Sequence, residues 1–496
     1  MRVLFRCDGS TRMGTGHLMR CLALAQACQD EGDSAQFVLA AEAHAFSARL
    51  SDEKILLHLL NAEAGSADDA AKTIAFYKAG GADWVVVDGY HFDAAYQRTL
   101  TDAGLKVLWV DDFGHVNAYS AELVLNQNLY AAARQYSGLA KNTRLLLGGR
   151  FALLRREFMR WSGCTRVTDG PARKVLVTLG GSDPDNVTLK VIEALGKVPQ
   201  LNLEANIVVG GSNPHQENLR QRAAENPRVK LLTNVRDMPA LMADSDFAIC
   251  AGGSTCWELA FMGLPGIVIV LADNQVRLAE SIKEAGAGLH AGCFQSCSAE
   301  SLAQMITTLA TDSAARKEMS RRAQELVDGG GASRVLMAMS GRRIRLRSAN
   351  AQDARQIFDW ANDPVVREVS FSSKPIVWDE HVAWFNKRLL DPDCVYFIAL
   401  NEMDRPAGQL RFDVRGREAV VSVSVDASSR GRGLGTQIIQ QGSARLFCTR
   451  PAVKLIRAYI KPGNTGSTAS FRKAGYADSE NTTVKGHEAL HLILHR

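Results

Sequence analysis

Short apolar runs alternate with helical stretches along the first two thirds of the chain. Residues 84–87 are apolar without interruption, as in a parallel strand that is buried on both faces. Residues 18–27 and 70–79 are rich in alanine and leucine and predict helices between the strands. Strands that alternate with helices in this way predict βαβ units and a parallel sheet. The strands predicted in this first half, residues 1–162, are 2–6, 36–40, 84–88, 107–111 and 123–126.

The same pattern begins again after a linker at residues 162–172, and it predicts a second α/β half over residues 171–338. Its predicted strands are 174–179, 206–209, 229–232, 247–250 and 267–271. Beyond residue 343 the runs alternate apolar and polar positions, which predicts an antiparallel sheet in a third domain, residues 343–496. Its predicted strands are 344–347, 398–400, 407–414, 419–426 and 455–460.

The length of 496 residues agrees with about three domains. A net charge of +5 gives no reason to expect a nucleic-acid partner. The ten cysteines are scattered and have neither zinc-site spacing nor a disulfide pattern, so we expect thiols in a reducing cytosol. The first residues resemble a strand rather than a signal peptide, and no apolar segment is long enough to span a membrane. We therefore expect a cytoplasmic protein that has no membrane partner; the sequence leaves the oligomeric state open.

A histidine stands where a glycine-rich loop meets the first helix. The loop contains Asp8, Gly14 and Gly16, and the helix begins with His17 and carries Arg20 one turn later. The spacing is not that of a dinucleotide fingerprint, and the loop lacks the lysine of a P-loop. The positive end of a helix favours a neutral imidazole, which is the form that a general base requires. The alternative is a histidine that only caps the helix.

A second glycine turn precedes an acidic residue in the second half. The predicted strand 247–250 runs into Gly252 and Gly253, and a helix pattern starts near Ser254 and Thr255. Amide groups at such a helix start can hold a diphosphate. Glu258 lies one turn further on, where its carboxylate can accept hydrogen bonds from ribose hydroxyls. The alternative is an ordinary turn with an exposed glutamate.

Together these features resemble the GT-B glycosyltransferases, which have twin Rossmann-like halves. Within that group residues 1–335 most resemble the nucleotide-sugar hydrolases of the pseudaminic acid pathway. The resemblance rests on RCDGSTRMGTGHLMRCLALA, VVVDGYHF, VDDFGH, LVTLGGSDPDN, AGGSTCWELAFMGLP and ADNQ. It implies removal of UDP from UDP-2,4-diacetamido-2,4,6-trideoxy-β-L-altropyranose by water, without a metal.

The resemblance also implies roles for individual residues. His17 would activate the water, and Asp8 would orient the loop or the histidine. Gly14, Gly16 and Arg20 would lie at the substrate. The remaining implied substrate residues are Tyr90 and Asn274 near the sugar, Glu258 on the ribose, and Gly252, Gly253, Ser254 and Thr255 on the diphosphate.

A third glycine loop follows a predicted strand of the last domain. It has the form Arg-x-x-Gly-x-Gly and leads into a helix, so its successive amides and arginines suit a pyrophosphate. The loop residues are Arg430, Gly431, Arg432, Gly433, Leu434, Gly435 and Thr436.

With the downstream segments KPGNTGS and FRKAGY, this loop resembles the GNAT acetyltransferases across residues 343–496. The resemblance implies an α+β fold that binds acetyl-CoA as cosubstrate on this loop. Asn464 and Ser467 would lie near the pantetheine arm, and the strand around Val423 and Val425 would hold the thioester.

One position departs from the pattern of that superfamily. Many members carry a tyrosine seven residues after the asparagine, as the acid for the departing thiolate, but here the residue is Phe471. Tyr459, Tyr476 or a water remain as alternatives. The candidates for facing the acceptor amine are Gln409, Arg411, Ser422 and Ser424.

The start of this domain more narrowly resembles sugar-nucleotide acetyltransferases of the same pathway, on WANDPVVREVSFSS, EHVAWFNKRL and GQLRFDV. Trp360 or Trp384 would stack on uracil or pack in the core, with core packing favoured for Trp384. The resemblance implies that the acetyltransferase makes the diacetamido nucleotide that the hydrolase then cleaves.

Three histidines spaced by four, His487, His491 and His495, would line one face of a helix as metal ligands do. Residues 491–495 instead alternate as a strand, so no metal site is expected.

Two other functions stay open at this stage. The first two halves suit a true glycosyltransferase with a sugar acceptor, and the last domain suits a degenerate module that only binds a sugar nucleotide.

Overall fold

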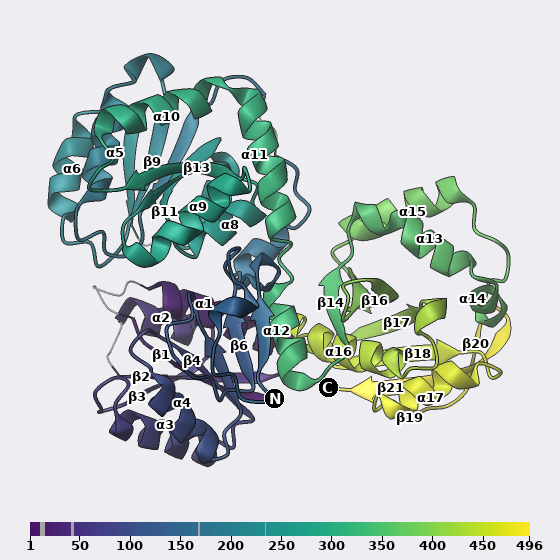
Figure 1. The fold of residues 1–496 in the computed structure, drawn as a ribbon. Helices are drawn as coiled ribbons and strands as arrows, with labels where there is room; N and C mark the ends of the chain where they lie inside the picture. Colours follow the sequence, from purple (N-terminus) through teal and green to yellow (C-terminus); the bar gives the residue numbers. More distant parts are fainter. Residues whose placement is uncertain (10–14, 41–43, 167–168, 234) are drawn as a thin grey trace. The chain divides into compact units, whose positions relative to one another are not determined.

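A computed structural model describes residues 1–9, 15–40, 44–166, 169–233 and 235–496 (Figure 1). The chain forms two compact units. The first comprises Met1–Cys28 and Ser34–Val335, and the second comprises Gln29–Asp33 and Leu336–Arg496. Within the described ranges no helix is both long and apolar enough to cross a membrane.

The N-terminal half of the first unit contains a seven-stranded parallel sheet with the order β3-β2-β1-β4-β5-β6-β7. Side chains of α3 and α4 pack on one face, and Figure 1 shows α1 and α2 on the other. All five predicted strands are present; the two edge strands, β3 and β7, were not predicted. The elements are β1 Arg2–Cys7, α1 Gly16–Asp30, β2 Ser34–Leu39, α2 His44–Asp52, β3 Leu56–Leu59, α3 Ala67–Gly80, β4 Trp84–Asp88, α4 Ala94–Asp102, β5 Val107–Val110, β6 Leu123–Asn126 and β7 Arg144–Leu147.

The second half repeats this architecture with a six-stranded parallel sheet, in the order β10-β9-β8-β11-β12-β13. One face packs against α5, α6 and α10, and the other packs against α7, α8, α9 and α11, which gives three layers. The elements are β8 Lys174–Thr178, α5 Val187–Gly196, β9 Glu204–Val209, α6 Gln216–Ala224, β10 Val229–Thr233, α7 Met238–Asp244, β11 Phe247–Ala251, α8 Thr255–Phe261, β12 Gly266–Val270, α9 Val276–Glu284, β13 Gly288–Cys293, α10 Ala299–Thr311, α11 Ser313–Leu326 and α12 Gly331–Ser340.

The second unit contains one mixed sheet in the order β14-β15-β16-β17-β18-β21-β19, with β20 paired to β21. Helices α16 and α17 cover one face, and α13 and α15 cover the other. The predicted strand at residues 491–495 is confirmed as part of β21. The elements are β14 Ile344–Ser348, α13 Ala354–Asn362, α14 Pro364–Val369, α15 Trp378–Leu390, β15 Cys394–Asn401, β16 Pro406–Arg415, β17 Glu418–Val425, α16 Leu434–Thr449, β18 Leu455–Ile460, α17 Thr465–Lys473, β19 Ala477–Asp478, β20 Thr482–Val484 and β21 His487–His495.

Strands β17 and β18 separate part of the way along the sheet of the second unit. They pair in parallel from Glu418 to Val420, opposite Leu455 to Arg457, and the pairing ends there although both strands continue. The last five residues of β17 remain paired with β16 on their other side. The two strands therefore form a wedge-shaped gap in the sheet. Their backbone groups do not hydrogen-bond to each other across this gap.

Candidate functional site

A cavity of about 680 Å³ lies within the first unit and is lined by residues from both of its halves. The two sheets contribute the loops that follow their strands, which is where ligands bind in open α/β sheets. Glycines bring these loops close: a Cβ on Gly181 would lie 3.3 Å from the Thr15 hydroxyl. The predicted residues that line the cavity are Gly16, His17, Arg20, Tyr90, Gly252, Gly253, Ser254, Thr255, Glu258 and Asn274.

 Ten of the twelve residues predicted for this unit therefore line the cavity, because Asp8 lies elsewhere and Gly14 falls outside the described residues.

His17 is held by a carboxylate that the sequence did not single out. Its Nδ1 lies 2.7 Å from Oδ1 of Asp88, the last residue of β4. A carboxylate only accepts hydrogen bonds, so this contact places the imidazole proton on Nδ1 and leaves the lone pair on Nε2. Burial raises the pKa of Asp88, but Arg20 and His17 outweigh it and hold that pKa well below its usual range. The arrangement fixes the orientation of the ring and directs Nε2 away from Asp88, as a general base requires.

Arg20 was predicted to contact substrate, but its guanidinium is engaged by protein carboxylates. It donates to both oxygens of Asp88, at 2.6 Å each, and to Oδ1 of Asp112 at 2.7 Å. Tyr90 donates to Oδ2 of Asp112 at 2.6 Å, and Asn274 of the second half donates to the Tyr90 hydroxyl at 3.1 Å. A chain of hydrogen bonds thus runs from the histidine to the opposite half of the unit.

The carboxylate that contacts His17 is that of Asp88 and not that of Asp8. The alternative role predicted for Asp8, orienting the glycine loop, concerns residues 10–14, which lie outside the described residues. Asp8 follows β1 and its carboxylate accepts from Arg6 at 2.6 Å and from the amide of Ala40 at 2.7 Å. His91 lies 3.1 Å away on its other side. The buried cation of Arg6 draws this carboxylate into the interior, away from the cavity.

The second glycine turn offers fewer amides than predicted. The amide of Gly252 already donates to the Ile269 carbonyl and the Gln275 side chain, each at 3.2 Å, and that of Gly253 donates to the Ala251 carbonyl. A side chain at position 252 would meet Gln275 at 2.9 Å, so only glycine fits. Among the described residues, the amides of Ser254 and Thr255 have no acceptor, and they are the ones that remain for an anion.

Glu258 faces the cavity beside an arginine that the sequence reasoning missed. Arg155 donates to Oε1 of Glu258 from Nη2 at 2.8 Å and from Nε at 3.1 Å. It also pairs with Glu157 at 2.9 Å. Oε2 of Glu258 has no hydrogen bond within the part of the chain that the structure describes, so it remains available to a ligand. Arg155 and Glu258 are far apart in the sequence, and only the fold brings them together.

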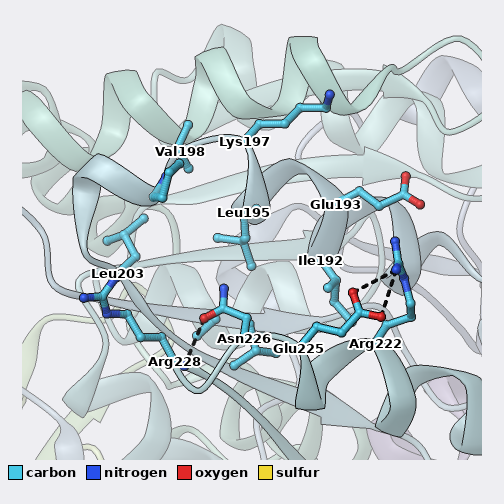
Figure 2. A pocket seen from close by; sticks show the side chains of 14 residues that line it. Ile192, Glu193, Leu195, Lys197, Val198, Leu203, Arg222, Glu225, Asn226 and Arg228 are labelled. Atoms are coloured by element: carbon cyan, nitrogen blue, oxygen red, sulfur yellow. Dashed lines mark hydrogen bonds and ion pairs between the residues drawn. The ribbon is translucent and has the colours of Figure 1, made fainter.

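A second hollow of about 530 Å³ lies at the opposite ends of the strands, around the starts of β9 and β10. Figure 2 shows its lining, in which Arg222 pairs with Glu225 at 2.8 Å and the Arg228 amide donates to Asn226. None of the predicted site residues lines it. Its position and its paired charges separate it from the histidine cavity.

In the second unit the predicted pyrophosphate loop has the geometry that such a loop requires. Gly431 and Gly433 have φ of 73° and 75°, a left-handed conformation that favours glycine. The loop leads directly into α16, a helix of 16 residues, whose first amides point out of its start. Arg430 is anchored by its Nε to the Val425 carbonyl at 3.0 Å and lies 3.2 Å from Asp363. The loop and the adjacent wedge therefore fit an anionic, elongated cosubstrate.

The residues downstream of the loop are partly structural. Asn464 caps α17 by accepting from the Ser467 amide at 3.1 Å. Phe471 is buried against Tyr476, with ring centroids 4.9 Å apart. The Tyr476 hydroxyl lies 2.8 Å from Ser443, and burial raises the pKa of this phenol. Tyr476 belongs to the core, so the structure excludes it as a substitute acid, while Tyr459 on β18 stacks on His491.

The candidates for facing the acceptor lie together on the face covered by α13 and α15. Gln409 pairs with Ser424, and Arg411 pairs with Ser422, on the adjacent strands β16 and β17. Arg411 lies over the ring of Trp384, 5.0 Å from its centre.

The two tryptophans differ in burial. Trp384 is 36% exposed, so the prediction that it packs in the core is wrong. Trp360 is 4% exposed and donates from Nε1 to Asp426 at 2.7 Å. Trp384 of α15 lies under the Arg411 guanidinium, whereas Trp360 of α13 packs against the side chains of β15.

Comparison with known proteins identifies both modules. Residues 175–332 match the glycosyltransferase family 28 C-terminal domain, and residues 343–477 match the acetyltransferase (GNAT) domain. The spore coat polysaccharide biosynthesis protein SpsG of Bacillus subtilis is 31% identical over 240 residues, which cover 48% of this chain and 69% of that protein.

Two further relatives extend the comparison. The UDP-2,4-diacetamido-2,4,6-trideoxy-β-L-altropyranose hydrolase of Campylobacter jejuni is 24% identical over 295 residues, which cover 58% of this chain and 97% of that enzyme. An uncharacterised protein of Methanocaldococcus jannaschii is 23% identical over 434 residues, which cover 83% of each chain. The chain therefore belongs to the family of SpsG and of the UDP-diacetamido-trideoxy-altropyranose hydrolases, and it joins that GT-B-like part to a C-terminal GNAT acetyltransferase domain.

Proposed function

We propose that this bifunctional enzyme hydrolyses UDP-2,4-diacetamido-2,4,6-trideoxy-β-L-altropyranose to UDP and free sugar, and acetylates the 4-amino group of the precursor nucleotide. The observation that carries the hydrolase is that His17, which lines the cavity, is held by the carboxylate of Asp88. The substrate named for the Campylobacter jejuni relative supports the choice of sugar.

In the proposed hydrolysis, Nε2 of His17 takes a proton from water as the water oxygen attacks the anomeric carbon. The bond from that carbon to the β-phosphate oxygen breaks, and UDP leaves with the bonding pair. Asp88 stabilises the imidazolium that forms. The free amides of Ser254 and Thr255 would bind the diphosphate, and Tyr90 and Asn274 would lie near the sugar.

In the proposed acetylation, acetyl-CoA supplies the acetyl group. The residues that would bind its pyrophosphate are the amides from Arg432 to Thr436, together with the Arg430 side chain. The wedge beside Val423 and Val425 would receive the thioester arm, with Asn464 and Ser467 next to it. The acceptor amine would approach from the face that carries Gln409 and Ser424.

The test supplies UDP-4-amino-4,6-dideoxy-N-acetyl-altrosamine and acetyl-CoA to the full chain and follows the products by mass spectrometry. We expect CoA, UDP and the free diacetamido sugar. Accumulation of the acetylated nucleotide without free sugar would contradict the hydrolase and favour a glycosyltransferase that needs an acceptor. Relatives named as N-acetylglucosamine transferases keep that second function under consideration. Acetyl-CoA that is bound but not consumed would favour a binding module.

Glu258→Gln is expected to weaken UDP binding by about 10- to 100-fold, since hydrogen bonds to a charged group contribute about 1.5–3 kcal/mol. The measurement is UDP affinity by calorimetry. Glu157→Gln is the matched control, because it also loses a contact with Arg155 but does not line the cavity. Equal losses in both variants would mean that Glu258 acts only by holding Arg155.

A further inference from the structure

Three polar side chains form a short chain beside the wedge of the second unit. Tyr396 of β15 donates from its hydroxyl to Oε1 of Gln409 on β16. Gln409 donates from Nε2 to the Ser424 hydroxyl oxygen at 3.3 Å. Tyr396 is 6% exposed and Ser424 is 8% exposed, so both are shielded from solvent. Residues far apart along the chain thus fix the orientation of one serine hydroxyl.

The direction of these hydrogen bonds determines what Ser424 can still do. Because Gln409 donates to its oxygen, the serine is an acceptor in this pair and its own proton remains to be given. Among the described residues no acceptor for that proton is present. A buried donor without an acceptor is costly, and such groups point to a ligand or water that completes them.

Ser424 also lies in the part of β17 that has left β18. Pairing between these strands ends at Val420, and Ser424 is four residues further on, toward the loop that begins at Arg430. Ser424 therefore lies on the part of β17 that borders the wedge. The usual acid position is filled by Phe471, which is in the core, and Tyr476 is bonded to Ser443.

We propose that the Ser424 hydroxyl, positioned by Gln409 and Tyr396, donates a hydrogen bond to the sulfur of CoA as the thiolate leaves. This inference rests on the proposed acetyl transfer. In that step the amine nitrogen bonds to the thioester carbon, the carbon–sulfur bond breaks, and sulfur keeps the bonding pair. One amine proton reaches the sulfur through water, so the products are the amide and the CoA thiol. Ser424 stabilises the charge on sulfur and undergoes no net proton transfer.

The test titrates the thiol of bound CoA in the full chain, by the ultraviolet absorbance of the thiolate. In the parent we expect the pKa of the bound thiol to lie below that of free CoA, and Ser424→Ala to raise it by about 1, which corresponds to a tenfold loss of thiolate. Ser424→Thr keeps the hydroxyl and should restore the parent value. Gln409→Leu should give part of the effect of Ser424→Ala, because it only frees the serine to rotate.

Kinetics provide the second readout. Ser424→Ala should lower kcat for acetyl transfer about tenfold and leave KM for acetyl-CoA unchanged. Thr449→Ala is the control, because it removes an exposed hydroxyl at the far end of α16. CoA that binds with the same thiol pKa in the parent and in Ser424→Ala overturns the inference. Failure of the parent to bind CoA overturns the proposed acetyl transfer itself.

Discussion

His17→Ala is expected to lower kcat for release of UDP from the diacetamido nucleotide by about 10²- to 10⁴-fold. The variant should still bind UDP, because the ring contributes to the chemical step rather than to the diphosphate or ribose contacts. Acetylation by the second unit should continue, so the diacetamido nucleotide accumulates. Product analysis by mass spectrometry and UDP calorimetry measure the two effects separately.

A substitution of Asp88, which holds His17, tests the same role of His17 as a base. Asp88→Asn would turn an amide N–H toward Nδ1 and favour the tautomer whose proton is on Nε2, which removes the base. We expect a loss of similar size, with UDP affinity retained. His58→Gln, on the edge strand β3, is the control and should leave hydrolysis unchanged. A variant at position 88 that hydrolyses at the parent rate would contradict the assignment of His17 as base.

Arg6→Met is expected to destabilise the first unit by about 3–5 kcal/mol, the usual consequence of leaving a buried charge without its partner. Arg6 is completely buried and bonds to Asp69 at 2.6 and 2.8 Å and to Asp8 at 2.6 Å. Removing it leaves the buried carboxylates of Asp8 and Asp69 without this cation. Hydrogen exchange of peptides from β1 and β4 in the full chain, at increasing urea, measures the loss.

The matched control for this variant is Lys72→Met, which breaks an exposed pair with Asp68. Such a surface pair contributes about 1 kcal/mol or less. Destabilisation of the same size in both variants would contradict the importance of the buried arginine.

The effect of Arg6→Met should also depend on pH. Burial raises the pKa of Asp69, but hydrogen bonds and charge from Arg6 outweigh it and keep the pKa below its usual value. A carboxyl group of this kind stabilises the fold above its unfolded pKa of about 4, and the stabilisation is lost as the pH falls through the folded value. The difference between parent and variant should therefore be full at pH 7 and shrink below about pH 4.

The central strands could be predicted from sequence because their burial leaves a continuous apolar run. Strands 84–88 and 123–126 begin and end where the pattern placed them. Strand 455–460 also matches its predicted bounds, but it was found by its alternation of buried and half-buried positions. The edge strand β3 carries Leu56 and Leu59 partly in solvent, and β13 has the mixed sequence GLHAGC. Half-exposed edges have neither a continuous run nor a strict alternation, which is why the pattern missed them.

The site was predicted where the chemistry is local and missed where it depends on the fold. His17 and Glu258 stand at the starts of helices after glycines, a signal that is visible in one short segment. Asp88 stands at the end of a strand that lies beside β1, so that its partner in the register is Cys7. The carboxyl ends of neighbouring parallel strands lie at the same edge of a sheet. The sequence does not give the order of the strands, so it could not show that β4, with Asp88 at its end, lies beside β1.

The hydrogen bond from Asn274 to Tyr90 has a consequence for exchanging parts between relatives. The Tyr90 hydroxyl donates its single proton in a hydrogen bond to Asp112. Its oxygen can therefore only accept from the side-chain amide of Asn274. Burial and Asp112 raise the pKa of Tyr90, which keeps that proton in place. A chimera that takes its second half from a relative with an apolar residue at position 274 would leave the tyrosine of the first half without its donor. Recombination between homologues should therefore preserve both positions together.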